Sequence, residues 1–282
     1  MGPLTGAIVL ALASALAYGS SDFLGGLAGR RAPASSVAFS SQLIGLAGMA
    51  LVVPLAGGSL HAADLVWGVG AGVGGGIGVA LLYRGLAVGQ MSVVAPVSAA
   101  GAACVPVLVG LLSGERPGPL ALVGMGVAIA AVMLLSFVPG HADRALARAG
   151  VATGLGAGAG FGAFFVLLDH VHAGSGLWPL VAAREASLLV LGVTVAVTGH
   201  AFRPTGAGRV IVAVGLLDVA ANFAYLLAAH RGLLSIVALL TSLYPAVTVV
   251  LARAVLGERL TRVQTAGLVA AVTAVAVIAV AV

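Results

Sequence analysis

The sequence predicts an all-α polytopic membrane protein with ten transmembrane helices, arranged as two inverted five-helix repeats. Its composition, the spacing of its apolar runs and an internal repeat all point to this fold class. Of the 282 residues, 61% are hydrophobic and only 7% are charged, whereas a soluble domain carries about 25% charged residues. So few charges cannot cover a water-facing surface, which excludes a soluble enzyme, a DNA-binding protein and a disordered tail.

Apolar runs follow one another along the whole chain, each long enough for a helix to cross the hydrocarbon core in about 20 residues. Short polar breaks separate them, and they lack the alternation in runs of about ten that is typical of a β-barrel. The first run follows no basic stretch, so we expect it to stay as a helix and not to be cleaved as a signal peptide. The expected spans are 4–25, 34–56, 64–83, 92–113, 118–138, 150–168, 177–198, 208–228, 234–256 and 263–282.

The two halves of the chain repeat one another at a constant offset of 143 residues. This offset places Gly114–Arg116 on Gly257–Arg259 and Ser92 on Ser235. Each half holds five expected helices, an odd number, so the halves must cross the membrane in opposite orientations. The predicted organisation is a repeat over 1–140, a connecting loop over 141–149 and a second repeat over 150–282.

The basic residues predict the orientation of the chain. All 13 are arginine, and they do not cluster on one face as a nucleic-acid interface would require. Positive residues favour cytoplasmic loops, so we expect the loops after odd-numbered helices inside the cell and both termini outside. The odd loops hold Arg30, Arg31, Arg84, Arg144, Arg148, Arg203, Arg209, Arg259 and Arg262, and the even loops hold only Arg116 and Arg231.

Several short motifs resemble a known family. Ser235–Ala238, Tyr244-Pro245 and Leu256–Leu260 are similar to the signature of the EamA-type drug/metabolite transporter superfamily, and Tyr18–Phe23 resembles its aromatic-Gly-Ser element. One departure is Ala102, which stands where the first half would repeat Pro245. The resemblance implies the ten-helix, two-repeat fold and a secondary carrier that exports, or less often imports, small metabolites or drugs.

Polar residues on the first expected helix share one face. An ionisable group at membrane depth costs about 3 kcal/mol or more, so such groups tend to face a wet cavity. Tyr18, Ser21 and Asp22 fall on the same face as Ser14 by helical spacing. Either this face lines a cavity with Asp22 as a proton or cation site, or the helix ends near Ser21 and Asp22 lies at the interface.

The eighth expected helix carries a second polar face, formed by Asp218, Asn222 and Tyr225 at positions i, i+4 and i+7. Asp218 lies about ten residues from either end of the expected span 208–228, too deep for its short side chain to reach the interface. We expect a functional carboxylate here, or else a structural ion pair, for which Arg184 is the most plausible partner.

Arg184 and Glu185 are adjacent in the seventh expected helix. Adjacent residues do not face each other on a helix, so each needs a different partner. Arg184 could hold a carboxylate substrate or neutralise Asp218. Glu185 has the same two alternatives, and proton coupling is a third because burial disfavours a charged carboxyl.

Other polar groups sit where charge is less costly. Glu115-Arg116 and Glu258-Arg259 lie at expected helix ends, where we expect them to order loops and not to take part in transport. His170 and His172 lie near an interface and make a weak metal site, so no metal is expected.

Glycines in the third and sixth expected helices recur every four residues. This small-xxx-small pattern lets helices approach closely in lipid. The glycines are Gly70, Gly74, Gly78, Gly154, Gly158 and Gly162.

The leading functional hypothesis is secondary transport of a small molecule by alternating access, with a site near the bilayer midplane between the two halves. The chain has no ATP-binding motif, so a gradient must supply the driving force, and protons are the candidate coupling ion. An uptake permease is one alternative. A passive channel or an assembly subunit is another, and neither of these would need carboxylates that titrate.

A polytopic enzyme is disfavoured because HExxH and GxSxG motifs are absent. No cofactor is implied, and we expect a monomer or homodimer in the cytoplasmic (inner) membrane.

Overall fold

The computed structural model describes residues 3–88, 91–137, 144–202, 207–257 and 259–281. Over these ranges the chain forms α-helices and one short 3-10 helix, without β-strands. The described residues contain ten spans that are long and apolar enough to cross a membrane, which confirms the predicted fold class. Residues 141–143 of the expected connecting loop, Arg203 and Glu258 lie outside the described residues, whereas residues 144–149 of that expected loop are helical.

The first half contains one helix per span. Their bounds follow the expected runs closely because the thickness of the bilayer sets the length of apolar sequence that each span needs. They are α1 (Pro3–Gly29), α2 (Ala34–Ala56), α3 (Ala62–Val88), α4 (Met91–Leu112) and α5 (Pro119–Ser136).

The second half follows the same order, but its fourth span is broken in two. Its elements are α6 (Arg144–Asp169), the 3-10 helix η1 (Ala173–Ser175), α7 (Trp178–Thr198), α8 (Gly208–Ala229), α9 (Leu234–Thr241), α10 (Tyr244–Leu256) and α11 (Arg262–Ala281).

The break between α9 and α10 comes directly before Pro245. Proline has no backbone N–H and so cannot donate to the carbonyl of Thr241 four residues earlier. The Ser242 hydroxyl closes the end of α9 by donating to the Ala238 carbonyl over 2.8 Å. In the first half α4 continues through Ala102, which occupies the equivalent position. The missing proline thus accounts for the continuous helix in one repeat and the broken helix in the other.

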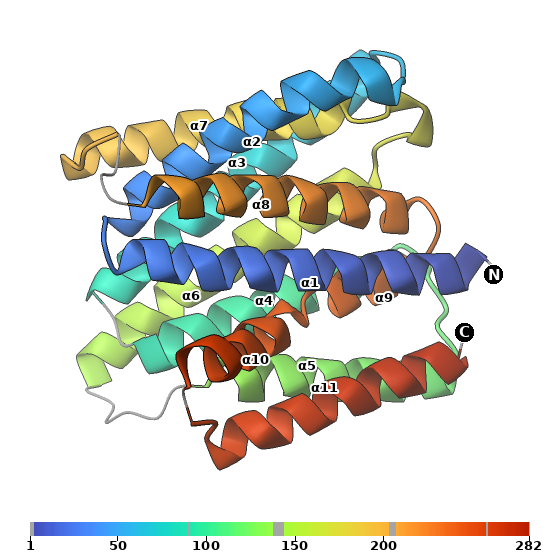
Figure 1. The fold of residues 1–282 in the computed structure, drawn as a ribbon. Coiled ribbons are helices and arrows are strands. Elements are labelled where there is room, and N and C mark those ends of the chain that lie inside the picture. The colour runs from blue at the N-terminus through green and yellow to red at the C-terminus, as the bar shows by residue number, and fades with distance from the viewer. Residues whose placement is uncertain (1–2, 89–90, 138–143, 203–206, 258, 282) are drawn as a thin grey trace.

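The two halves are interleaved. Helix α1 packs along α8, while α6 packs along α3 and α4. Figure 1 shows α1 and α8 side by side, with α5 and α11 forming a pair at one edge. The start of α1 and the end of α11 lie at the same end of the molecule (Figure 1); we call it the terminal end, and the loops after even-numbered spans lie there.

Close helix crossings occur at the spaced glycines. A Cβ atom on Gly158 would lie 2.7 Å from the Ser98 carbonyl oxygen of α4 and 2.8 Å from the Cα atom of Gly101. A Cβ atom on Gly74 would lie 3.1 Å from the Gly160 carbonyl oxygen. Residues without a side chain at these positions let α6 approach both α4 and α3 closely.

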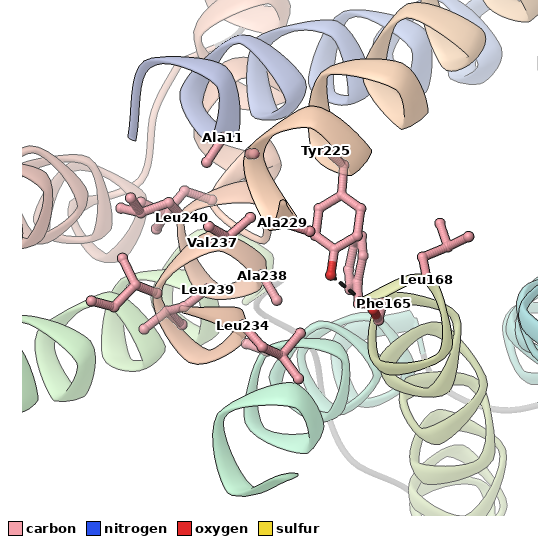
Figure 2. Close-up of a cluster of buried hydrophobic side chains, with 14 of the residues drawn as sticks. Ala11, Phe165, Leu168, Tyr225, Ala229, Leu234, Val237, Ala238, Leu239 and Leu240 are labelled. Carbon is pink, nitrogen blue, oxygen red and sulfur yellow. Dashed lines mark hydrogen bonds between the residues drawn. The ribbon is translucent and has the colours of Figure 1, made fainter. Parts of the chain in front are cut away.

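Helix α9 lies at the centre of the apolar core, near the terminal end. Every residue from Leu234 to Thr241 is buried. Figure 2 shows Leu234, Val237 and Leu240 of α9 among side chains from neighbouring helices. The Tyr225 side chain is fully buried beside them, and its hydroxyl donates to the Phe165 carbonyl oxygen over 2.8 Å (Figure 2). The core therefore joins α9, α8 and α6 into one packed body.

Candidate functional site

A cavity of about 220 Å³ lies inside the bundle, between the two halves. Eight helices contribute to its wall, four from each half of the chain. Its lining combines three charged side chains, several polar groups and five aromatic rings. The lining residues are Tyr18, Asp22, Gln42, Gly72, Gly75, Val79, Leu82, Ala102, Phe161, Phe164, Phe165, Leu180, Ala183, Arg184, Ser187, Asp218, Asn222 and Tyr244.

The polar face of α1 contacts α8 through a row of hydrogen bonds. The Ser14 hydroxyl donates to the Ala221 carbonyl oxygen over 2.8 Å, and the Tyr18 hydroxyl donates to Oδ1 of Asn222 over 2.8 Å. The Ser21 hydroxyl donates to a third acceptor on α8, the Val214 carbonyl oxygen, over 3.1 Å. The predicted faces of the two helices therefore meet.

Arg184 and Asp218 form an ion pair in the cavity wall. Nη1 of Arg184 lies 2.5 Å from Oδ2 of Asp218, so the pair that the sequence analysis gave as an alternative is present. Nη1 also donates to Oε1 of Gln42. Nδ2 of Asn222 donates to Oδ2 of Asp218 over 3.2 Å. The Asp218 carboxylate is thus held by one cation and one amide.

Asp22 also lines the cavity, but its carboxylate is not held in this way. Helix α1 continues to Gly29, so the alternative in which the helix ends near Ser21 is wrong. The side chain of Asp22 is exposed and belongs to the cavity wall. Within the described part of the chain, no ion pair or hydrogen bond involves the Asp22 carboxylate.

Three of the residues expected in the pathway lie elsewhere. Glu185 is exposed on the outer face of α7, the face that also carries Leu189, which is 73% exposed. Tyr225 is fully buried in the core, and Ser21 is buried against α8. Of the eight expected residues, the structure brings Tyr18, Asp22, Arg184, Asp218 and Asn222 to one cavity.

Other lining residues were not predicted from the sequence. Gln42 is an amide at membrane depth in α2, directly after Ser40 and Ser41, and this short polar stretch could have marked it. Tyr244 comes directly before the helix-breaking Pro245. The phenylalanines of α6 gave no signal, because apolar residues surround them along the whole helix.

Polar contacts also join the halves at the terminal end. Both carboxylate oxygens of Glu115 accept bonds from the first turn of α9, from the Leu234 N–H over 2.6 Å and the Ser235 N–H over 3.1 Å. This fits the loop-ordering role expected for Glu115.

A second contact at the terminal end was not expected from the sequence. Asp64, buried in the first turn of α3, accepts a bond from the Ser175 hydroxyl and lies 2.9 Å from Nδ1 of His172. His170 points to a different partner and stacks on Trp67 at a ring-centre distance of 4.7 Å. The described residues contain no group of three or more side chains that could hold a metal ion.

Comparisons with known proteins agree with this architecture. The model of the EamA-like transporter family matches twice, over residues 5–137 and 148–280. A solved crystal structure superposes with a TM-score of 0.77 over 97% of this chain and 96% of its own length, at 16% sequence identity. At that identity the likeness concerns the fold alone. A comparison with curated proteins found no match.

Proposed function

This chain belongs to the EamA-like transporter family, and we propose that it is a proton-coupled secondary carrier that exports a small molecule across the cytoplasmic membrane by alternating access. The observation that carries the proposal is the cavity between the halves, where Asp22, Arg184 and Asp218 meet. Charged groups are costly at membrane depth and are retained mainly where they serve a pathway or a pairing.

The contacts at the terminal end support alternating access. Glu115 joins the end of α4 to α9, and Asp64 joins α3 to the segment between α6 and α7. Both contacts join the first half of the chain to the second, so opening at this end requires them to break. The arginine distribution predicts that this end lies outside the cell. In the proposed cycle the present conformation is therefore closed toward the outside.

The two aspartates support proton coupling. A carboxylate at membrane depth without a fixed partner is a candidate site for proton uptake, and Asp22 lines the cavity in this way. Asp218 is held as a carboxylate by Arg184. A substrate that competes with the proton for Asp22, or with Asp218 for Arg184, would link its own occupancy to protonation. Such competition is the minimum requirement for proton antiport.

The experiment uses inside-out membrane vesicles from an overexpressing strain, with a fluorescent dye that reports the pH gradient. A chemically varied panel of amines, carboxylates, sugars and neutral aromatic compounds is added one by one. We expect at least one compound to dissipate the gradient with wild-type protein, and much less with Asp22→Asn or Asp218→Asn at equal protein abundance. Asp169→Asn is the matched control, since Asp169 does not line the cavity.

Three results would count against the proposal. A panel with no active compound would contradict proton-coupled export. Uphill transport at wild-type rates by both asparagine variants would show that these carboxylates are structural, which would leave coupling to Glu185 or to no proton at all. Flux that runs only down the substrate gradient would indicate the alternative, a passive channel.

A further inference from the structure

The charges of the cavity do not balance. Arg184 and Asp218 neutralise each other through their ion pair. Asp22 lines the same cavity and has neither a cation nor a hydrogen-bond donor on its carboxylate within the described residues. With all three groups ionised, the described lining carries one net negative charge. A cation that enters the cavity is therefore attracted, and an anion is repelled.

Most of the remaining wall is aromatic. Tyr18, Phe161, Phe164, Phe165 and Tyr244 all line the cavity. The rings lie close together: the Tyr18 and Tyr244 ring centres are 6.3 Å apart, and those of Tyr18 and Phe165 are 6.5 Å apart. Aromatic faces attract organic cations, most strongly where water is excluded. The wall thus offers a carboxylate together with several rings.

The volume limits the size of the occupant. At about 220 Å³ the cavity lies below the range of about 300–1,000 Å³ that is usual for drug-sized ligands. Aliphatic side chains, such as Val79 and Leu82, occupy part of the wall between the polar groups. The fitting ligand is therefore small and has an apolar surface around its charge.

We propose that the substrate of this cavity is a small organic monocation of the ammonium type, which binds at the Asp22 carboxylate among the aromatic rings. The inference rests on the proposed function, since it names the substrate class of the same site. A proton and the ammonium group then compete for Asp22, which gives the competition that antiport requires.

Other ligand classes fit the wall less well. An anion or a zwitterion would need the Arg184 guanidinium, which is already engaged by Asp218 and Gln42. An alkali or alkaline-earth ion favours a shell of several oxygen atoms. The lining oxygen atoms of Gln42, Asp218 and Asn222 already accept bonds from other side chains of the wall. The organic cation alone uses both the carboxylate and the rings.

The test uses three compounds of nearly equal shape and different charge: choline, neutral 3,3-dimethyl-1-butanol and anionic 3,3-dimethylbutanoate. Thermal unfolding of the purified full chain in detergent is followed at millimolar ligand, because a ligand that binds the folded state raises Tm. We expect only choline to raise Tm, with weaker apparent affinity at lower pH. Asp22→Asn should weaken choline binding about tenfold or more, while Asp169→Asn should leave it unchanged.

The outcomes separate the inference from the proposed function. Stabilisation by the alcohol or the carboxylate to the same extent as by choline, or no response to choline, overturns the cation assignment. Wild-type choline affinity in Asp22→Asn also overturns it. Choline binding that depends on Asp22, in a protein whose vesicles show no proton-coupled flux, would support the ligand class and contradict the carrier. Proton-coupled flux of a neutral or anionic compound would support the carrier and contradict the assignment of an organic cation as the substrate.

Discussion

The Tyr18 hydroxyl of α1 donates to Oδ1 of Asn222 on α8 over 2.8 Å, and this bond joins the two halves of the chain in the cavity wall. Helices α1 and α8 are antiparallel, so the residues four positions later on α1 and four positions earlier on α8 lie one turn further along the same seam. These residues are Asp22 and Asp218. The hydrogen bond therefore fixes the register that brings both carboxylates to one cavity.

Replacing Tyr18 with phenylalanine should loosen this register. The change removes the Tyr18 hydroxyl, so Oδ1 of Asn222 loses its hydrogen-bond donor. The expected loss in the free energy of unfolding is about 1 kcal/mol. We expect a Tm lower by a few degrees in detergent and weaker proton-coupled flux. Tyr244→Phe is the matched control, because within the described residues the Tyr244 hydroxyl makes no hydrogen bond. Equal losses of Tm in the two variants would contradict a specific role for the Tyr18 bond.

Arg184 and Asp218 should show strong energetic coupling. Arg184→Met leaves the Asp218 carboxylate with only the Asn222 amide, and Asp218→Asn leaves the guanidinium with only Gln42. Each single change leaves one charge unpaired at membrane depth, whereas the double change removes both. We expect the double variant to be more stable than the sum of the single effects predicts, by about 1–3 kcal/mol. Unfolding in mixed micelles measures all four free energies, and additive effects would show that the two residues act independently.

The sequence predicted the helical spans well and the cavity in part. The bounds of a span depend on the length of its apolar run, which can be counted in the sequence. Helical spacing likewise placed Tyr18 with Asp22, and Asp218 with Asn222. Spacing could not tell which of Arg184 and Glu185 faces inward, because neighbouring residues on a helix point about 100° apart and either could be the inner one. The structure places Arg184 at the cavity and Glu185 on the outer face.

The aromatic lining of the cavity could not be predicted from the sequence for a different reason. In a soluble protein an apolar stripe marks the buried face of a helix. In a membrane span both the core face and the lipid face are apolar, so Phe161 and Phe164 do not differ in type from residues that face lipid. Long-range packing decides their position, and one sequence does not contain that information.

Leucine at a close helix crossing should prevent correct packing. A Cβ atom on Gly158 would already lie 2.7 Å from the Ser98 carbonyl oxygen, which is backbone and cannot rotate away. We expect Gly158→Leu to reduce the amount of folded protein in the membrane strongly. Gly74→Leu should have a similar effect, since the Gly160 carbonyl oxygen is close. The control is Gly126→Leu, because nothing lies within 4 Å of a Cβ atom there; similar losses in all three variants would contradict the packing argument.

The orientation can be tested with reporters fused to the C-terminus. Nine arginines in odd-numbered loops against two in even-numbered loops predict both termini outside the cell. A fusion of alkaline phosphatase after Val282 should therefore be active, and a fluorescent protein that matures only in the cytoplasm should not. The opposite pair of results would reverse the orientation, and the cavity would then be closed toward the cytoplasm in the present conformation.

Glu115 should hold the terminal end closed. Its carboxylate accepts from two backbone N–H groups in the first turn of α9, which are otherwise unsatisfied donors at a helix start. Glu115→Ala removes both bonds, so we expect a loss of about 1–2 kcal/mol and more frequent opening at this end. Glu115→Gln keeps one acceptor oxygen and should have a smaller effect.

Thiol labelling measures this opening directly. Cys104 is the single cysteine of the chain, so Cys104→Ala gives a background in which Leu234→Cys is the only thiol. Leu234 is 4% exposed, and a membrane-impermeant maleimide added outside should label it slowly. We expect Glu115→Ala to speed labelling several-fold and Arg116→Ala to leave it unchanged, because Arg116 is exposed one residue away. An unchanged rate in Glu115→Ala, or an equal rise with Arg116→Ala, would show that other contacts keep this end closed.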